Sequence, residues 1–215
     1  MNRLVGLETE YGIQVDDVEK MDVVVESMEL IRCFLHEKFV ARWDYARENP
    51  RQDMRGFEVD ELLNDVDETE HLQRDRKRQI PLKELKSDLI IRNGARLYND
   101  HTHPEYSTPE CLSLIDLATY DRAGEQILHV CAKQRTATRD SGVVRLYKNN
   151  TDFEGHSYGC HENYLIGREI PFQQVIDGLL PFVVTRPIFA GAGKVGVENV
   201  TGGPLPPYQL SQRAD

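Results

Sequence analysis

The chain has 215 residues, of which 40% are hydrophobic and 29% charged, and its formal net charge is −10. These values are typical of a globular protein with one substantial core, and the acidic charge argues against general nucleic-acid binding. No run of about 18 apolar residues and no apolar leader is present, so we expect neither a membrane span nor a secretory signal. The four cysteines form no C-x-x-C pair, so we expect free thiols in a reducing cytoplasm.

A strand is predicted over residues 2–13, and it carries Glu8 and Glu10 two positions apart. Because successive side chains of a strand alternate between its faces, both carboxylates lie on one face. They repel each other unless a cation lies between them or water surrounds them. The pair therefore indicates either a site for a hard metal ion such as Mg²⁺ or an exposed strand face, and alone it favours the exposed face.

Residues 22–39 have an apolar stripe that predicts a packing helix. The next segment, about 41–88, is largely polar, and only a short helix at 60–64 is predicted within it. Since it has no apolar periodicity long enough for a core element, we predict a long mobile insertion of the kind that forms lids or binding segments. Its basic run, Arg74–Arg78, is either solvated or docks an acidic partner.

A second strand is predicted over residues 89–100, and its alternation places Arg96, Tyr98 and Asp100 on one face. A cation, a phenol and a carboxylate do not suit an apolar core face. A proline then ends the strand, and Glu105 adds another carboxylate. This stretch indicates either a functional face rich in ligand groups or the polar side of a solvated edge strand.

A long helix is predicted from Ser113 to about residue 138, because Ser113 and Asp116 resemble a capping box. A further strand is predicted over residues 143–149. Pro171 then opens another helix, since proline is favoured at the first helical position. The apolar side chains of that helix predict that it lies in the core.

The strand predicted over residues 157–166 is polar on both faces, with Glu162 on one face and His161 and Asn163 on the other. Burying a His-Glu-Asn run inside a sheet is costly unless polar partners are present. The run therefore indicates the wall of a polar cleft or an edge strand.

Four stretches, in order and spacing across essentially the whole chain, resemble the Pup ligase/Pup deamidase family (PafA and Dop). They are Gly6–Gly12, Asn93–Cys111, Tyr147–Leu165 and Leu180–Lys194, closing on Leu210–Arg213. The resemblance implies an α+β, glutamine synthetase-like fold, in which a curved, mostly antiparallel sheet packed with helices cradles ATP and Mg²⁺. Members of the family are about twice as long, so we expect residues 1–215 to be the N-terminal part of the catalytic domain, without the C-terminal half and small C-terminal domain.

Within the family, the chain resembles Dop more than PafA. Residues 42–57 with the polar insertion resemble a loop that Dop has and PafA lacks, and the spacing from Asp100 to Glu105 also matches Dop. Two short stretches, 150–152 and 159–162, resemble PafA instead. We favour Dop because an insertion and a spacing are harder to acquire than single substitutions.

The resemblance implies a cytoplasmic, ATP- and Mg²⁺-dependent Pup deamidase/depupylase of the bacterial Pup–proteasome pathway. Such an enzyme hydrolyses the C-terminal glutamine amide of Pup and the isopeptide bond between Pup and a lysine. One alternative is the Pup–protein ligase, which forms that bond through a γ-glutamyl phosphate. A second alternative is a non-catalytic paralogue that binds Pup or nucleotide. The implied partners are Pup and pupylated proteins, with neither nucleic acid nor a membrane.

The resemblance also implies roles for individual residues. Asp100 is carried over as the catalytic residue, acting as nucleophile or general base. The implied Mg²⁺ ligands are Glu8, Glu10, Tyr98 and Glu105. The implied ATP contacts are Arg96 and Thr108, and His161 and Glu162 are implied cleft residues. These roles require the strands that carry Glu8 and Asp100 to face each other across one cleft, as a carboxylate cage for Mg²⁺. Because Pup is acidic, we expect a local basic groove, for which Arg74–Arg78 is the nearest basic run.

Overall fold

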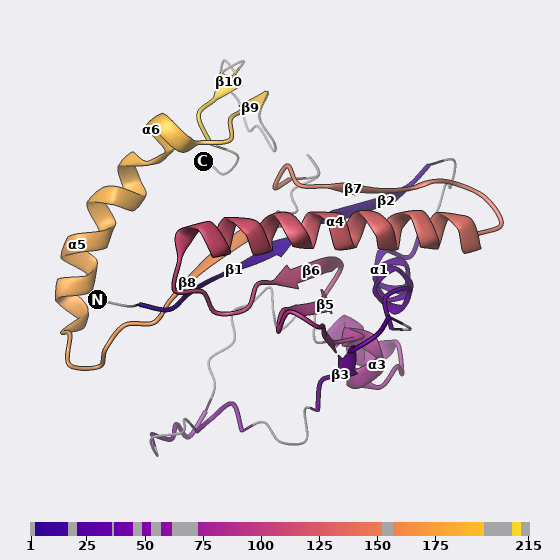
Figure 1. The fold of residues 1–215 in the computed structure, drawn as a ribbon, viewed down its shortest axis with the longest axis horizontal. Helices are drawn as coiled ribbons and strands as arrows, with labels where there is room; N and C mark the ends of the chain where they lie inside the picture. The colour runs from indigo at the N-terminus through magenta and orange to yellow at the C-terminus, as the bar shows by residue number, and fades with distance from the viewer. Residues whose placement is uncertain are drawn as a thin grey trace.

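The computed structural model describes residues 3–16, 21–35, 37–44, 49–52, 57–61, 73–151, 157–195 and 208–211. Among these residues the largest sheet is antiparallel and six-stranded, with the order β3-β4-β5-β6-β1-β8 (Figure 1). Its strands are β3 (Ala41–Arg42), β4 (Leu89–Ile90), β5 (Arg96–Asp100), β6 (His103–Ser107), β1 (Val5–Glu10) and β8 (Cys160–Tyr164). Two antiparallel ribbons accompany it, β2 (Gly12–Val15) with β7 (Val144–Tyr147) and β9 (Lys194–Val195) with β10 (Tyr208–Gln209).

The helices are distributed unevenly around this sheet. Those with a label are α1 (Val23–Arg32), α3 (Leu82–Lys86), α4 (Leu114–Thr138), α5 (Phe172–Thr185) and α6 (Pro187–Ala190), and residues 73–77 are also helical. Helix α4 runs along the sheet, α1 and α3 lie together at one end, and α5 and α6 stand at the other end, on the left of Figure 1. None of the helices in the described part of the chain combines the length and apolarity needed to cross a bilayer.

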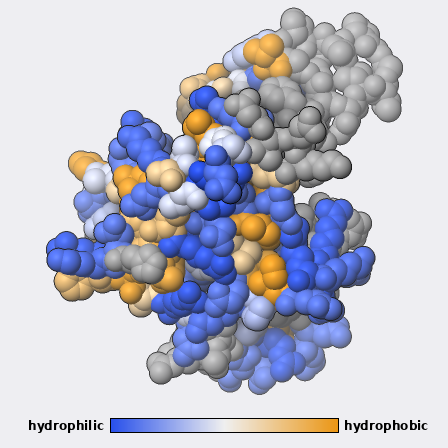
Figure 2. Space-filling view, turned by 90° about the vertical axis from the view of Figure 1, so that its right-hand side faces the viewer, coloured by the Kyte–Doolittle hydropathy of each residue, from blue (hydrophilic) through white to orange (hydrophobic). Residues whose placement is uncertain are grey.

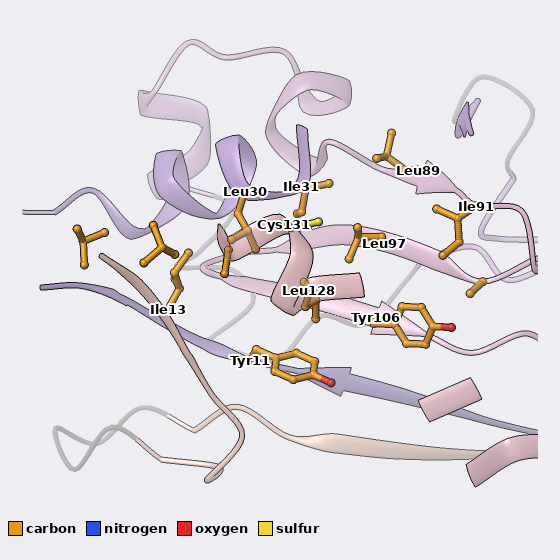
Figure 3. Packing of buried hydrophobic residues seen from close by; sticks show 14 residues of the cluster. Tyr11, Ile13, Leu30, Ile31, Leu89, Ile91, Leu97, Tyr106, Leu128 and Cys131 are labelled. Carbon is orange, nitrogen blue, oxygen red and sulfur yellow. The ribbon is translucent and has the colours of Figure 1, made fainter. Parts of the chain in front are cut away.

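The main core lies between the sheet and the helices α1 and α4. Figure 3 shows Ile31 of α1 and Leu128 of α4 in one cluster with Leu97 and Tyr106 of the sheet. All four are at most 1% exposed. Because strand side chains alternate, burying this face directs the neighbouring residues of β5 and β6 to the opposite face of the sheet. That opposite face is polar, and it carries the candidate site.

The approach of α4 to the sheet depends on a glycine. A Cβ atom placed on Gly124 would lie 2.3 Å from a ring carbon of Tyr106, so only glycine allows the helix to pack this closely. Ser113 caps the same helix, since its hydroxyl accepts hydrogen bonds from the backbone N–H groups of Ile115 and Asp116. The predicted long helix with its Ser113 cap is therefore confirmed.

Two predicted strands are wrong in extent, because each is divided by a turn. The strand expected over residues 2–13 divides at Tyr11, whose N–H donates to Pro104 O, and its second half pairs with β7 instead of the main sheet. The strand expected over residues 89–100 is the hairpin β4–β5, which turns at Gly94 with φ of +85°. The proline expected to end a strand lies inside β6, because the chain has already turned at His101, whose φ is +52°.

Three expectations about helices also need correction. Helix α1 ends at Arg32, well before residue 39. The insertion does contribute to a core, since Leu85 of α3 is 3% exposed and packs with Val24 and Met28. The expected helix over 60–64 falls largely outside the described residues.

Helix α5, which we expected in the core, buries none of its residues. Most of its apolar side chains are exposed, although α6 packs against it. Figure 2 shows a different face, the end of the molecule where α1 and α3 lie, and that face is mostly hydrophilic.

Candidate functional site

The open face of the main sheet carries polar side chains in rows across neighbouring strands. In one row Glu8 lies between His161 of β8 and Ser107 of β6, which in turn pairs with Arg96 of β5. Cross-strand partners on one face lie about 4.5–5.5 Å apart at Cβ, so each row brings its functional groups together.

The next row places Glu105 of β6 between Glu10 of β1 and Tyr98 of β5. Beyond it, Asp100 pairs with His103. The antiparallel register therefore brings the acidic residues of three strands to one place.

The carboxylates form two overlapping groups that could hold a metal ion. Ligand atoms of Glu8, Glu105 and His161 lie within 4.8 Å of one another, and so do ligand atoms of Glu10, Asp100 and Glu105. A hollow of about 300 Å³ opens over them, lined by Glu8, Lys86, Arg96, Tyr98, Asp100, Glu105 and His161. Clustered carboxylate oxygens are the ligands that hard divalent cations such as Mg²⁺ prefer.

Burial and repulsion by neighbouring carboxylates disfavour the charged forms of Glu105 and Glu10. Glu105 is 2% exposed, and burial, reinforced by Asp100, Glu10 and Glu8, raises its pKa to about 8, although a hydrogen bond with Tyr98 acts in the opposite direction. Burial also raises the pKa of Glu10, with a smaller contribution from Asp100. The pKa of Tyr98 is raised by burial and by Glu105. A divalent cation would relieve this repulsion, so the residues present fit Mg²⁺.

Two cations border the acidic cluster. Lys86 Nζ lies 3.3 Å from Asp100 Oδ1. Arg96 donates to both carboxylate oxygens of Asp88, and its guanidinium lies 4.5 Å from the centroid of the Trp43 ring. Positive groups beside a metal-binding cluster can accept an anionic ligand such as a phosphate.

Two histidines approach the same carboxylates from different strands. His161 Nδ1 lies 3.4 Å from a carboxylate oxygen of Glu8, and His103 Nδ1 lies 3.8 Å from one of Glu10. Glu10 also accepts a hydrogen bond of 2.6 Å from the backbone N–H of Gly159. Because β6 and β8 flank β1, these contacts orient the acidic side chains of β1 from both neighbouring strands.

Seven of the nine residues assigned from the resemblance meet at this hollow or at its edge. They are Glu8, Glu10, Arg96, Tyr98, Asp100, Glu105 and His161. Thr108 lies in a neighbouring hollow that Arg96 also lines, and its hydroxyl accepts a hydrogen bond from the N–H of Leu7. Glu162 lies on the opposite face of its strand, where it pairs with Arg186 at 2.8 Å.

The expected cleft between two facing strands is wrong in one respect. The strands that carry Glu8 and Asp100, β1 and β5, belong to the same sheet, with β6 between them. Their acidic side chains converge because they project from one surface. The strand with His161 is β8, which ends the described sheet, and His161 also lines the hollow, so the edge strand and the polar cleft wall both apply to it.

Sequence reasoning missed three residues beside the site, namely Lys86, Asp88 and His103. The first two lie in the segment interpreted as a mobile insertion, where no periodic pattern marked them. His103 follows a predicted strand, and only the pairing of Asp100 with His103 in the hairpin places it on the site face.

Comparisons with known proteins identify relatives of this chain. The family model described as Pup-ligase protein matches residues 3–215. A depupylase of Acidothermus cellulolyticus is 41% identical over 100% of this chain and 41% of its own length. A Pup deamidase/depupylase of Mycolicibacterium smegmatis is 37% identical over 100% of the chain and 42% of its own length. A Pup–protein ligase of Mycobacterium bovis is 52% identical, but over 60% of the chain and 29% of its own length.

The crystal structure of the complex between the prokaryotic ubiquitin-like protein Pup and its ligase PafA is similar with a TM-score of 0.68 and 30% identity. The similarity covers 99% of this chain and 34% of that chain. The expected glutamine synthetase-like α+β fold with an antiparallel sheet is thereby confirmed. The chain spans 41% of the length of the first of these relatives.

Proposed function

This chain belongs to the Pup-ligase family, and on that premise we propose that the protein is a Pup deamidase/depupylase acting in the cytoplasm. It would hydrolyse the C-terminal glutamine amide of Pup and the bond between Pup and a lysine of a pupylated protein. The observation that carries the proposal is the position of Asp100, which lies at the edge of the carboxylate cluster in the same hollow. That the full-chain relatives at 37–41% identity are named depupylase or Pup deamidase/depupylase supports hydrolysis.

The acidic residues of the sheet are assigned to the metal. Glu8, Glu10, Tyr98 and Glu105 would hold Mg²⁺, with His161 beside Glu8. When bound, Mg²⁺ with its nucleotide would supply positive charge that stabilises an oxyanion. Arg96 would contact a phosphate of ATP from the wall of the hollow, and Thr108 would do so from the neighbouring hollow.

Asp100 is assigned to the reacting amide. Its Oδ1 is held by Lys86 at 3.3 Å, so Oδ2 is the oxygen that would attack the carbonyl carbon or take a proton from the attacking water. The contact with the Lys86 ammonium orients this carboxylate beside its acidic neighbours. Both side chains are 29% exposed, so the pair remains accessible to a substrate.

Because Pup is acidic, we expect it to contact basic side chains of this protein. The basic run Arg74–Arg78 lies close to the site. Its Asp75 is 4.0 Å from His101, which follows Asp100. Arg78 is already paired with Asp22 at 2.6 Å, so the exposed Arg76 and Lys77 are the residues proposed to contact Pup. Reversal of both charges should weaken Pup binding, and unchanged affinity would exclude this run as the docking site.

The test is mass spectrometry of two substrates after incubation with the full-length protein, ATP and Mg²⁺. Pup ending in glutamine should lose one ammonia, and a Pup–lysine conjugate should release its target. An Asp100→Asn variant should do neither. Absence of both reactions in the unchanged protein would refute the proposal.

Ligation is the second candidate. A Pup–protein ligase of Mycobacterium bovis is 52% identical to this chain, although the match covers 60% of it. Incubation of Pup ending in glutamate with a target protein separates the two functions. A new conjugate would identify a ligase, whereas nucleotide binding without either reaction would identify a non-catalytic paralogue.

A further inference from the structure

We propose that Lys86 and Asp88 are positioning residues of the site, so that the end of the insertion is part of the catalytic machinery. Lys86 would position Asp100 for the reacting amide, and Asp88 would position Arg96 for the nucleotide. The inference rests on the proposed function, because that function assigns Asp100 to the reacting amide and Arg96 to the nucleotide.

The backbone that carries both residues is fixed to the sheet. Asn99, which is 1% exposed, donates a hydrogen bond of 3.1 Å to Leu85 O, and Leu85 itself is buried against α1. Ser87 adopts φ of +47° and donates to Glu84 O at 2.8 Å. The N–H of Trp43 donates to Asp88 O at 3.1 Å, which ties the two ends of the insertion together.

Asp88 holds the guanidinium of Arg96 in one orientation. Arg96 Nη2 lies 2.5 Å from Asp88 Oδ2, and Arg96 Nε lies 3.4 Å from Asp88 Oδ1. Trp43 and Tyr98 present their rings to the same guanidinium, at 4.5 and 5.2 Å from their centroids. A forked ion pair combined with ring stacking restricts a side chain that otherwise has several free torsions.

Burial distinguishes this ion pair from a surface contact. The Asp88 side chain is 2% exposed, whereas that of Arg96 is 35% exposed toward the hollow. One partner is therefore buried as a support, and the other keeps an accessible edge for a ligand. The guanidinium can bind an anion there without rotating, so the entropy of ordering it is lost on folding and not on binding.

Lys86 acts on Asp100 in a comparable way. The groups are 3.3 Å apart, and ligand atoms of Glu10 and Glu105 lie within 4.8 Å of a carboxylate oxygen of Asp100. The carboxylates of Glu10 and Glu105 repel Asp100, and the Lys86 ammonium offsets that repulsion. The ammonium therefore holds the reactive carboxylate between the acidic cluster and α3.

The two residues predict different kinetic effects in the full-length protein. Asp88→Asn should raise the KM for ATP and the Kd for Mg²⁺–ATP by about tenfold, with little change in kcat, because it loosens a binding group. Lys86→Met should lower kcat by about tenfold or more at saturating ATP with little change in that Kd, because it affects the reacting group. Lys86→Arg should restore most of the lost rate.

Glu84 provides a matched control on the same helix. It pairs with Arg32 and Arg42 at 2.8 Å and does not line the hollow. Glu84→Gln should therefore leave both kinetic constants unchanged, even if the protein becomes less stable. If Asp88→Asn and Lys86→Met behave like Glu84→Gln, or each lowers kcat and affinity alike, the positioning roles are wrong.

Calorimetry of Mg²⁺–ATP binding separates failure of this inference from failure of the proposed function. If the unchanged protein binds nucleotide but neither hydrolyses nor ligates Pup, the proposed function fails, and the change of Kd in Asp88→Asn still tests Asp88. If Asp88→Asn does not fold, Asp88→Glu is the second variant. It keeps the negative charge, but its longer side chain displaces the carboxylate that holds Arg96 and should also weaken nucleotide binding. Unchanged affinity in that variant overturns the role of Asp88.

Discussion

Glu105 on β6 is the direct cross-strand partner of Glu10 on β1, and the two carboxylates lie on the same face of the sheet. Two buried acids in such a pair cannot both ionise without cost unless a cation lies between them. The arrangement therefore links folding stability, pH and metal binding, and each link can be measured.

The first prediction concerns pH in the presence of EDTA. Burial raises the pKa of Glu105 from 4.5 to about 8. Between these values the folded protein binds more protons than the unfolded chain, so the free energy of unfolding falls as pH rises, by up to about 1.4 kcal/mol per pH unit. Urea unfolding at several pH values measures this slope. Glu105→Gln should flatten it, and an equal slope in that variant would assign the effect to other groups.

The second prediction concerns Mg²⁺. Because ligand binding to the folded state stabilises it, adding Mg²⁺ should raise the melting temperature, most strongly near pH 8 where Glu105 ionises. The double variant Glu8→Gln, Glu105→Gln should lose this response. Asp16→Asn removes a carboxylate paired with Arg145 away from the site and is the control. A response that survives in the double variant would place the ion elsewhere.

The third prediction concerns the reacting carboxylate. Asp100→Asn should lower the rate of Pup hydrolysis by about 10²–10⁴-fold, which is the contribution typical of a positioned acid or base. It should keep the affinity for Mg²⁺–ATP within a few-fold, since other residues carry that contact. Asp121→Asn, on α4 beside Lys148, should retain full activity. Rate assays measure Pup hydrolysis and calorimetry measures Mg²⁺–ATP affinity on the same samples. Loss of both in Asp100→Asn would contradict the prediction.

The fourth prediction compares two helical glycines. Gly124→Ala should destabilise the protein by about 1–3 kcal/mol, because the new methyl group meets the Tyr106 ring and overpacks the core. Gly178→Ala has no atom within 4 Å of the new methyl group, so it should stabilise α5 by up to about 1 kcal/mol. Chemical denaturation gives both values, and opposite signs are expected. Equal effects would show that α4 can move away from the sheet.

The site strand could be predicted because its pattern is local. Alternation along β5 alone places Arg96, Tyr98 and Asp100 on one face, and the structure confirms this. The order of strands was not predictable in the same way, because pairing β1 and β5 to opposite edges of β6 depends on contacts between distant segments. The expectation of a cleft between facing strands was wrong for that reason.

The supporting residues show the same limit. Asp88 directly precedes β4, and Arg96 is the first residue of β5, eight positions later in the sequence. The turn at Gly94 brings the two side chains together, so their pairing could not be predicted from the local pattern. Lys86 comes from a helix of five residues, too short to give a clear periodic signal. The apolar pattern of α5 correctly predicted a helix, but amphipathicity does not reveal whether a covering element is present.

The apolar side chains of α5 and α6 have a practical consequence for handling the 215-residue chain by itself. Phe172, Ile188 and Phe189 are each more than 70% exposed. Exposed hydrophobic surfaces of this kind favour self-association, so light scattering should show that particle size increases with protein concentration. Biophysical work on the isolated polypeptide is therefore best done at low protein concentration, or after polar replacement of these three side chains, none of which lines the hollow over the acidic cluster.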